Sequence, residues 1–239
     1  MIGLISGWFV ARLLLTCPSR GRPELIKTMI ESYEMTKSND SDLCIYLDND
    51  DPNLIYYIEN IDKKYYIVGD RMPVAQIHNH IIDIHPAYQY YMPINDDIKF
   101  LNNGWDIMLI NAINERGGGW GIAFGRDTDG VEFYPQFPTF SVVSRNIINT
   151  IGYVYPRELK MLFGDTFLLD IGRAIGKLFY VPDIVIQHKQ PVHLDTYEVK
   201  SKDFYNSERD AYAKYIDNKL EDDVNKLLEA ISLQGVLRE

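Results

Sequence analysis

The sequence predicts an α/β fold with a largely parallel sheet that is covered by helices on both faces. Three observations support this fold class. Four short apolar runs in the first hundred residues are typical of buried strands, and segments with apolar residues at helical spacing separate them. Each run also ends in polar residues, and parallel α/β sheets place their ligands beyond the carboxyl ends of the strands.

The composition is that of an ordinary globular chain. Its 239 residues, of which 46% are hydrophobic, are enough for one large domain with a substantial core. The formal net charge of -10 argues against general affinity for nucleic acid or anionic lipid, because such binding needs clustered Lys and Arg. Cys17 and Cys44 lie near the ends of predicted strands, which favours buried thiols and a cytoplasmic location.

The first fifteen residues are apolar, but they predict no stable membrane span and no signal peptide. Arg12 interrupts the segment, and no basic region precedes it. We therefore expect residues 13–16 to form the first buried strand and residues 1–11 to form an extension before it.

The first half alternates strands and helices. Apolar runs predict the four strands 13–16, 43–47, 65–68 and 88–94. Pro23 precedes apolar residues at helical spacing, so a helix is expected over 23–37, and the same spacing predicts a helix over 74–84. A further helix begins near Trp105 and ends at the glycines of 117–119.

The second half is less regular. Strands are expected over 121–124, 139–143 and 180–187, and helices over 145–151, 166–178 and 207–233. The last helix is charged on one side and apolar on the other, which predicts that it packs on the domain. A role for this helix in binding a partner remains open.

The polar strand ends are the main functional signal. They read Ser19-Arg20, Asp48-Asn49-Asp50, Asp70-Arg71 and Asn95-Asp96-Asp97. Asn and Asp are common in turns, so these segments could instead be polar turns that follow the strands and have no ligand. Adjacent carboxylates at the end of an apolar run also suit a divalent cation, since burying an unpaired carboxylate is costly. Because the same edge carries such residues four times, we favour a binding site there.

Five segments, taken in order, resemble a known family of enzymes. They are Leu14–Pro23, Leu47–Asp50, Asn95–Asp97, Gly164-Asp165 and Ile186–His188. Over residues 13–189 the chain is similar to nucleotide-diphospho-sugar glycosyltransferases of the GT-A fold, in particular the large inverting family (family 2-like). The resemblance implies a Rossmann-like single domain, 1–239. Its parts are a nucleotide-sugar-binding half (12–103), an acceptor and catalytic half (104–190), and a C-terminal helical extension (200–235).

The resemblance assigns the nucleotide sugar to six residues: Ser19, Arg20, Asp48, Asp50, Arg71 and Asp96. Asp48 is expected to accept from a ring N–H of a uracil-type base, and Asp50 to contact the ribose. Arg20, Arg71 and also Arg22 suit the diphosphate, because a guanidinium forks onto two phosphate oxygens and stays charged.

The same resemblance implies a metal ion, Mn²⁺ or Mg²⁺, on the diphosphate. In the DXD-like motif Asn95 replaces the first acid, so the metal is assigned to Asp97, and Asp96 to the ribose or a metal-bound water. His188, after the last predicted strand, is expected to complete the metal shell, although a lone histidine is often structural. Its imidazole would favour Mn²⁺.

Asp165 is the expected general base of an inverting transfer, taking the proton of the acceptor hydroxyl. The family often has two adjacent acids here, and this chain has Gly164-Asp165. A helix N-cap is the structural alternative for Asp165. Asp170 is a weaker choice for the base.

The function expected from the sequence is that of a metal-dependent inverting glycosyltransferase. Its partners would be a nucleotide-sugar donor, most simply a UDP-sugar, and a saccharide or other hydroxyl acceptor. One alternative is a catalytically silent nucleotide-sugar-binding or interaction domain. Another is a sugar nucleotidyltransferase, which needs a glycine-rich, lysine-bearing first loop that residues 18–23 match poorly.

Overall fold

The computed structural model describes residues 12–38, 40–128, 137–188 and 201–236, so the expectation for residues 1–11 lies outside the described part. The described residues form one eight-stranded sheet in the order β3-β2-β1-β4-β7-β6-β8-β5. Its strands are β1 (Leu13–Ser19), β2 (Ser41–Asp48), β3 (Tyr66–Gly69), β4 (Tyr90–Pro93), β5 (Ile98–Phe100), β6 (Ile122–Asp127), β7 (Ser141–Ser144) and β8 (Leu178–His188).

The predicted α/β fold class is confirmed, and the sheet as a whole is mixed. β1 pairs in parallel with β2 and β4, and β2 with β3, as the alternating strands and helices of the first half predict. In the second half β7 runs antiparallel to β4 and β6, and β5 runs antiparallel to β8, while β6 and β8 are parallel. The carboxyl ends of β1, β2 and β4 therefore meet at one edge.

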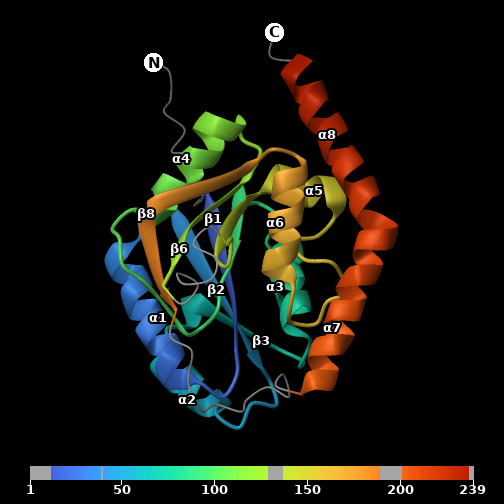
Figure 1. The fold of residues 1–239 in the computed structure, drawn as a ribbon. Coiled ribbons are helices and arrows are strands. Elements are labelled where there is room, and N and C mark those ends of the chain that lie inside the picture. Colours follow the sequence, from blue (N-terminus) through green and yellow to red (C-terminus); the bar gives the residue numbers. More distant parts are fainter. Residues whose placement is uncertain (1–11, 39, 129–136, 189–200, 237–239) are drawn as a thin grey trace, which may run out of the picture.

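Helices cover both faces of the sheet (Figure 1). One face carries α1 (Pro23–Thr36), α2 (Leu54–Asn60) and α4 (Trp105–Gly117). The other carries α3 (Val74–Ile84), α5 (Arg145–Ile151), α6 (Gly164–Ala174) and the C-terminal helices α7 and α8.

Alternation along the strands explains why two cores form. In β1, Leu13, Leu15 and Cys17 face one core, and Leu14 faces the other, because successive strand residues point to opposite faces. Cys17 and Cys44 are buried and free, as predicted, and lie in different cores.

The C-terminal helix packs on the body of the protein, as its apolar side predicts. It is longer than expected and comprises α7 (Lys202–Tyr215), a π-helical turn over Ile216–Leu220, and α8 (Glu221–Val236). Tyr212, Tyr215 and Leu227 are buried against the second core. Among the helices that the structure describes, none is long and apolar enough to cross a membrane.

Two short elements that the sequence did not reveal, α2 and β5, follow the carboxyl ends of β2 and β4 in the chain. The three-residue β5 pairs with β8 across Ile98 and His188 and is too short to show a period. In α2, Tyr57 is fully buried, but Ile55 is 71% and Ile58 is 47% exposed.

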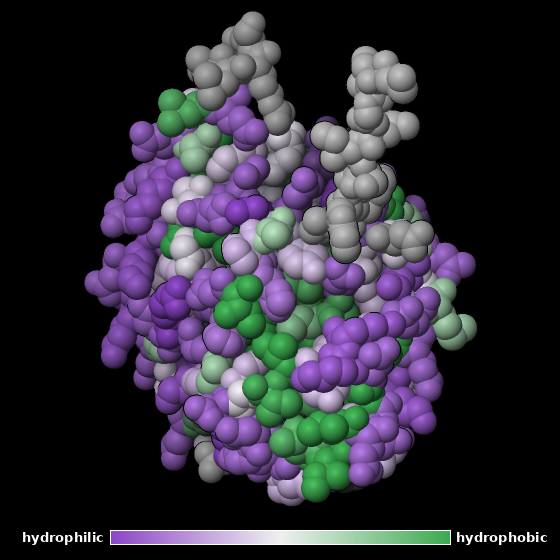
Figure 2. Space-filling model, turned by 180° about the vertical axis from the view of Figure 1, so that it is seen from behind, coloured by the Kyte–Doolittle hydropathy of each residue, from purple (hydrophilic) through white to green (hydrophobic). Residues whose placement is uncertain are grey.

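Seen from behind, the surface is mostly hydrophilic with one strip of hydrophobic residues (Figure 2).

Candidate active site

Two adjoining clefts lie at the carboxyl ends of the central strands. The first, here called the Arg20 cleft, has a volume of about 340 Å³. The second, the Asp97 cleft, has a volume of about 460 Å³. Pro18, Val74 and Met161 line both, so the two clefts form one bipartite site.

The Arg20 cleft gathers four of the residues that the sequence singles out: Ser19, Arg20, Asp48 and Arg71. Arg20 Nη1 donates to Asp48 Oδ2 at 3.1 Å and also to the carboxylate of Asp50. Asp50 itself does not line the cleft, and its side chain is 53% exposed. The structure thus brings Asp50 to Arg20 from the solvent side.

Asp48 offers an unused acceptor in this cleft. Its side chain is 7% exposed, and no described residue donates a hydrogen bond to the buried Oδ1. Burial raises the pKa of Asp48 above its ordinary value, while the hydrogen bond from Arg20 lowers it. A buried acceptor without a donor is costly, so this oxygen is suited to an N–H of a bound ligand.

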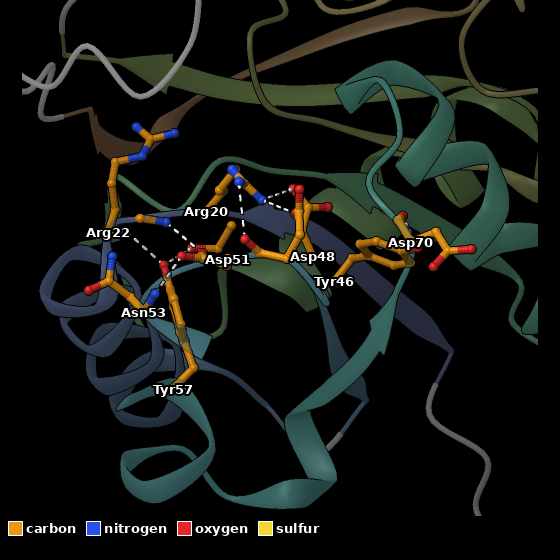
Figure 3. Close-up of polar contacts among 11 residues, drawn as sticks. Arg20, Arg22, Tyr46, Asp48, Asp51, Asn53, Tyr57 and Asp70 are labelled. Carbon is orange, nitrogen blue, oxygen red and sulfur yellow. Dashed lines mark hydrogen bonds and ion pairs between the residues drawn. The ribbon is translucent and has the colours of Figure 1, made fainter. Parts of the chain in front are cut away.

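The loop after β1 is held by the loop after β2 (Figure 3). Asp51 accepts from the backbone N–H of Gly21 at 2.7 Å and from that of Asn53 at 2.8 Å. The hydroxyl of Tyr57 accepts from the backbone N–H of Arg22 at 2.8 Å. The side chain of Arg22 points away from this network (Figure 3). Sequence reasoning missed Asp51 and Tyr57, because the groups that they hold in the loop after β1, the backbone N–H groups of Gly21 and Arg22, are distant in the chain.

Arg22 instead reaches into the Asp97 cleft and contacts both acids of the DXD-like motif. Its Nη2 lies 3.2 Å from Asp96 Oδ1, and its Nη1 lies 3.4 Å from Asp97 Oδ2. Asp96 is fully buried and also accepts from Ser19 Oγ at 2.7 Å. Burial raises the pKa of Asp96 to about 6, although Arg22 and the hydrogen bond from Ser19 lower it. An arginine thus neutralises the site that the sequence assigns to a metal.

His188 lies beside Asp97 because β5 pairs antiparallel with β8, which places Ile98 opposite His188. The imidazole Nε2 is 3.4 Å from Asp97 Oδ1, and Nδ1 is 3.3 Å from Asp127 Oδ2. Burial lowers the pKa of His188, but the hydrogen bonds to Asp127 and Asp97 outweigh it and raise the pKa to about 10. Asp127, at the end of β6, was not recognised in the sequence.

The Asp97 cleft contains part of the ligand set that a divalent cation needs. The part of the chain that the structure describes contains no group of three His, Cys, Asp or Glu arranged to hold a metal. Asp97 nevertheless offers a carboxylate, and His188 offers an imidazole nitrogen once it releases its proton, as metal binding requires. The Nδ1 contact with Asp127 orients the ring as in many metal sites. Two protein ligands fit a cation that a nucleotide diphosphate also coordinates.

Asp165 lines the Asp97 cleft from the first turn of α6. The N-cap of α6 is Phe163, so the alternative prediction that Asp165 serves as the helix N-cap is wrong. Its Oδ1 accepts from the backbone N–H of Thr166 at 2.7 Å. Burial raises the pKa of Asp165, and the hydrogen bond from Thr166 opposes this shift. Asp170, the weaker choice, accepts from the hydroxyl of Tyr212 and does not line the cleft.

Gly164 stands where the resemblance has a second acid, and the packing explains this departure. A Cβ at this position would lie 2.7 Å from the ring of Tyr155, which has little room to move because it is 9% exposed. Tyr155 lines the same cleft. Asp165 is therefore the acid that this segment presents.

Comparison with solved structures identifies the fold. No protein-family model matches the sequence, and neither does the sequence of any curated protein. Among solved structures, S. aureus TarS 1–349 with UDP-GlcNAc is similar at a TM-score of 0.61 and 13% identity, over 91% of this chain and 70% of that chain. The mannosyltransferase PcManGT from Pyrobaculum calidifontis, with GDP-Man and Mn²⁺, is similar at a TM-score of 0.57 and 11% identity, over 95% and 76%. The chain therefore has the GT-A-type fold of nucleotide-sugar glycosyltransferases.

Proposed function

We propose that this protein is a metal-dependent inverting glycosyltransferase that moves a sugar from a nucleoside-diphosphate donor to a hydroxyl acceptor. The observation that carries the proposal is the joining of two clefts. One presents arginines and the unused acceptor of Asp48, and the other presents paired acids with Asp165. Structures of the same fold hold UDP-GlcNAc or GDP-Man, which supports a donor of this class.

The Arg20 cleft would hold the nucleoside. Asp48 Oδ1 accepts from a ring N–H of the base, and a uracil offers such a donor next to a carbonyl. Arg20 and Arg71 lie on the same cleft and meet the ribose side and the diphosphate, since a guanidinium binds phosphate oxygens in pairs. In this proposal residues 12–103 form the donor half. Ser19 positions Asp96 through a hydrogen bond, and Asp50 positions Arg20 in the same way.

Asp97 and His188 would hold a Mn²⁺ or Mg²⁺ ion, with Mn²⁺ favoured by the imidazole. When bound, such an ion neutralises charge on the departing nucleoside diphosphate. Asp127 keeps the His188 ring in place. Arg22, which contacts both acids, would be close enough to the ion to pair with the diphosphate as well.

Asp165 would act as the general base in the acceptor half, residues 104–190. Its carboxylate takes the proton of the acceptor hydroxyl as that oxygen bonds to the anomeric carbon. The bond from that carbon to the diphosphate oxygen breaks on the opposite face, so the configuration inverts. A pKa that burial has raised brings the base closer to working pH.

Isothermal titration calorimetry with UDP and GDP, with and without Mn²⁺, tests the proposal. We expect UDP to bind more tightly when Mn²⁺ is present. A wild-type protein that binds neither nucleotide in any condition would overturn the proposal. The configuration of the product, read by NMR from the anomeric coupling, distinguishes inversion from retention.

Two other functions remain distinguishable in the same assays. A silent binding domain would bind the nucleotide sugar but would neither transfer the sugar nor hydrolyse the donor. A sugar nucleotidyltransferase would form pyrophosphate from UTP and a sugar 1-phosphate. The cytoplasmic location and the lack of nucleic-acid binding stay predictions, which fractionation and a gel-shift assay would test.

A further inference from the structure

A short segment, Lys160–Phe163, forms the wall between the two clefts. Met161 lines both clefts, Lys160 lines the Arg20 cleft, and Leu162 and Phe163 line the Asp97 cleft. This wall segment is followed directly by Gly164 and Asp165. Its position therefore sets both the shape of the donor site and the location of the carboxylate of Asp165.

One side chain of α7 holds the wall segment. Oε2 of Glu208 accepts from the backbone N–H groups of Lys160 at 2.9 Å, Met161 at 2.8 Å and Leu162 at 3.1 Å. Glu208 is 1% exposed. A carboxylate buried to this extent is stable only when donors satisfy it, and three consecutive amides form the concave donor set that binds anions.

Two tyrosines of α7 hold the next residue of the segment. The ring of Phe163 stacks on Tyr212, with 5.6 Å between the centroids and 13° between the planes. Tyr205 approaches the same ring at 5.6 Å with a tilt of 47°. Tyr205, Glu208 and Tyr212 are spaced i, i+3 and i+7, so they share one face of the helix.

The backbone of Phe163 shows why such support is needed. Its φ is 67°, and it is the only residue other than glycine with a positive φ in the part of the chain that the structure describes. A side chain with a Cβ disfavours this conformation, which persists only where the surrounding structure imposes it. Contacts from α7 to the backbone N–H of Leu162 and to the ring of Phe163 supply that constraint.

We propose that α7 is part of the active site and that Glu208 is a positioning residue, which holds the wall segment and through it Asp165. This inference rests on the proposed transferase function. Phe204, on the same helix, lines the Arg20 cleft and extends the contact surface for the nucleotide. The C-terminal helix, which the sequence predicts only to pack on the domain, thus takes part in donor binding and in catalysis.

The charge and the length of the Glu208 side chain both matter. Glu208→Gln retains one carbonyl acceptor but loses the charge that strengthens three hydrogen bonds, so the wall segment loosens. We expect kcat to fall about 10- to 100-fold, because displacing a catalytic group by about 1 Å has an effect of this size. Glu208→Asp, which keeps the charge, recovers part of kcat.

Tyr212→Phe is the matched control. It removes the hydrogen bond from α7 to Asp170 but keeps the ring that stacks on Phe163, and it leaves Glu208 unchanged. Hydrogen–deuterium exchange should show faster exchange at the amides of 160–162 in Glu208→Gln than in Tyr212→Phe. Melting temperatures of all variants separate this local loosening from global unfolding.

The outcomes distinguish the two proposals. Wild-type protein without nucleotide binding would overturn the transferase function itself. A wild type that binds UDP and transfers sugar, with Glu208→Gln equal to Tyr212→Phe in kcat and in amide exchange, would overturn only the role of Glu208. If Glu208→Gln does not fold, Glu208→Asp and Phe204→Ala replace it. Phe204→Ala should raise the Kd for UDP without changing kcat, and an unchanged Kd would remove α7 from the nucleotide site.

Discussion

Arg22 Nη2 lies 3.2 Å from Oδ1 of Asp96, whose side chain is fully buried at the end of β4. The proposed metal site thus contains a cationic side chain of the protein itself. This arrangement matters for stability, because a buried carboxylate without a counter-charge is strongly unfavourable.

Replacing Arg22 should therefore destabilise the protein and increase its response to metal. We expect Arg22→Met to lower the free energy of unfolding by about 3 to 5 kcal/mol, the usual cost of breaking a buried ion pair. Added Mn²⁺ should raise the melting temperature of this variant more than that of the wild type. The control is Arg20→Met, because Arg20 pairs with Asp48 and Asp50 and not with the acids of the proposed metal site. Equal responses of the two variants to Mn²⁺ would contradict the role of Arg22.

Asp97 should carry the metal dependence of nucleotide binding. Asp97→Ala removes the carboxylate beside His188 and should abolish the gain in UDP affinity that Mn²⁺ provides. Calorimetric titration of UDP with and without Mn²⁺ measures this gain. Asp50→Ala, an acid on the solvent side of the site, should retain it. A full Mn²⁺ effect in Asp97→Ala would refute the metal assignment.

Asp165 should govern the chemical step without affecting donor binding. We expect Asp165→Asn to lower kcat by about 10²- to 10⁴-fold and to leave the Kd for UDP unchanged. Since burial raises the pKa of Asp165, kcat of the wild type should rise with pH through that pKa and then level off. Asp170→Asn, on the same helix but outside the cleft, is the control. Loss of UDP binding in Asp165→Asn would place this residue in the donor site instead.

His78 should make the protein less stable in acid. Its Nδ1 shares a hydrogen bond of 2.7 Å with Thr16 Oγ1, and burial lowers its pKa to about 3. In the unfolded chain His78 binds a proton below about pH 6.5, whereas in the native state it stays neutral down to about pH 3. The free energy of unfolding therefore decreases as the pH is lowered from about 6.5 to about 3. From pH 7 to pH 5 this residue should contribute a loss of about 2 kcal/mol.

Urea unfolding at both pH values tests this sign. His78→Gln should lose less stability on acidification than the wild type, whereas His80→Gln, on the same helix but partly exposed, should behave as the wild type does. Asp96 acts in the opposite direction, because its raised pKa favours the native state as the pH falls toward 4. The difference between variant and wild type therefore isolates His78. Parallel pH curves would show that His78 is protonated in the native state.

Much of the fold follows from local patterns. Alternating strand and helix signals were sufficient for β1, β2 and β4, and for α1 and α3, because each buries a regular apolar stripe. The carboxyl ends of parallel strands meet at one edge for topological reasons, so the sequence also indicated where the polar residues gather.

Other parts depend on contacts between distant segments. The short strand β5 has no period of its own, yet its pairing with β8 brings His188 to Asp97. Asp127 joins the same group only through the parallel pairing of β6 with β8. No pattern within β6 marks Asp127 as a partner of a histidine sixty-one residues later.

The sequence by itself determined the α/β class, the order of most elements, and the edge of the sheet that carries Asp48 and Asp97. Only the tertiary structure decided which charges are paired. It showed that Arg22 forms an ion pair with Asp96 and that the carboxylate of Glu208 accepts hydrogen bonds from the backbone of the wall segment. Hydrophobic periodicity is local and repeats along the chain, whereas an ion pair depends on two side chains meeting in space, and their separation in sequence carries no period.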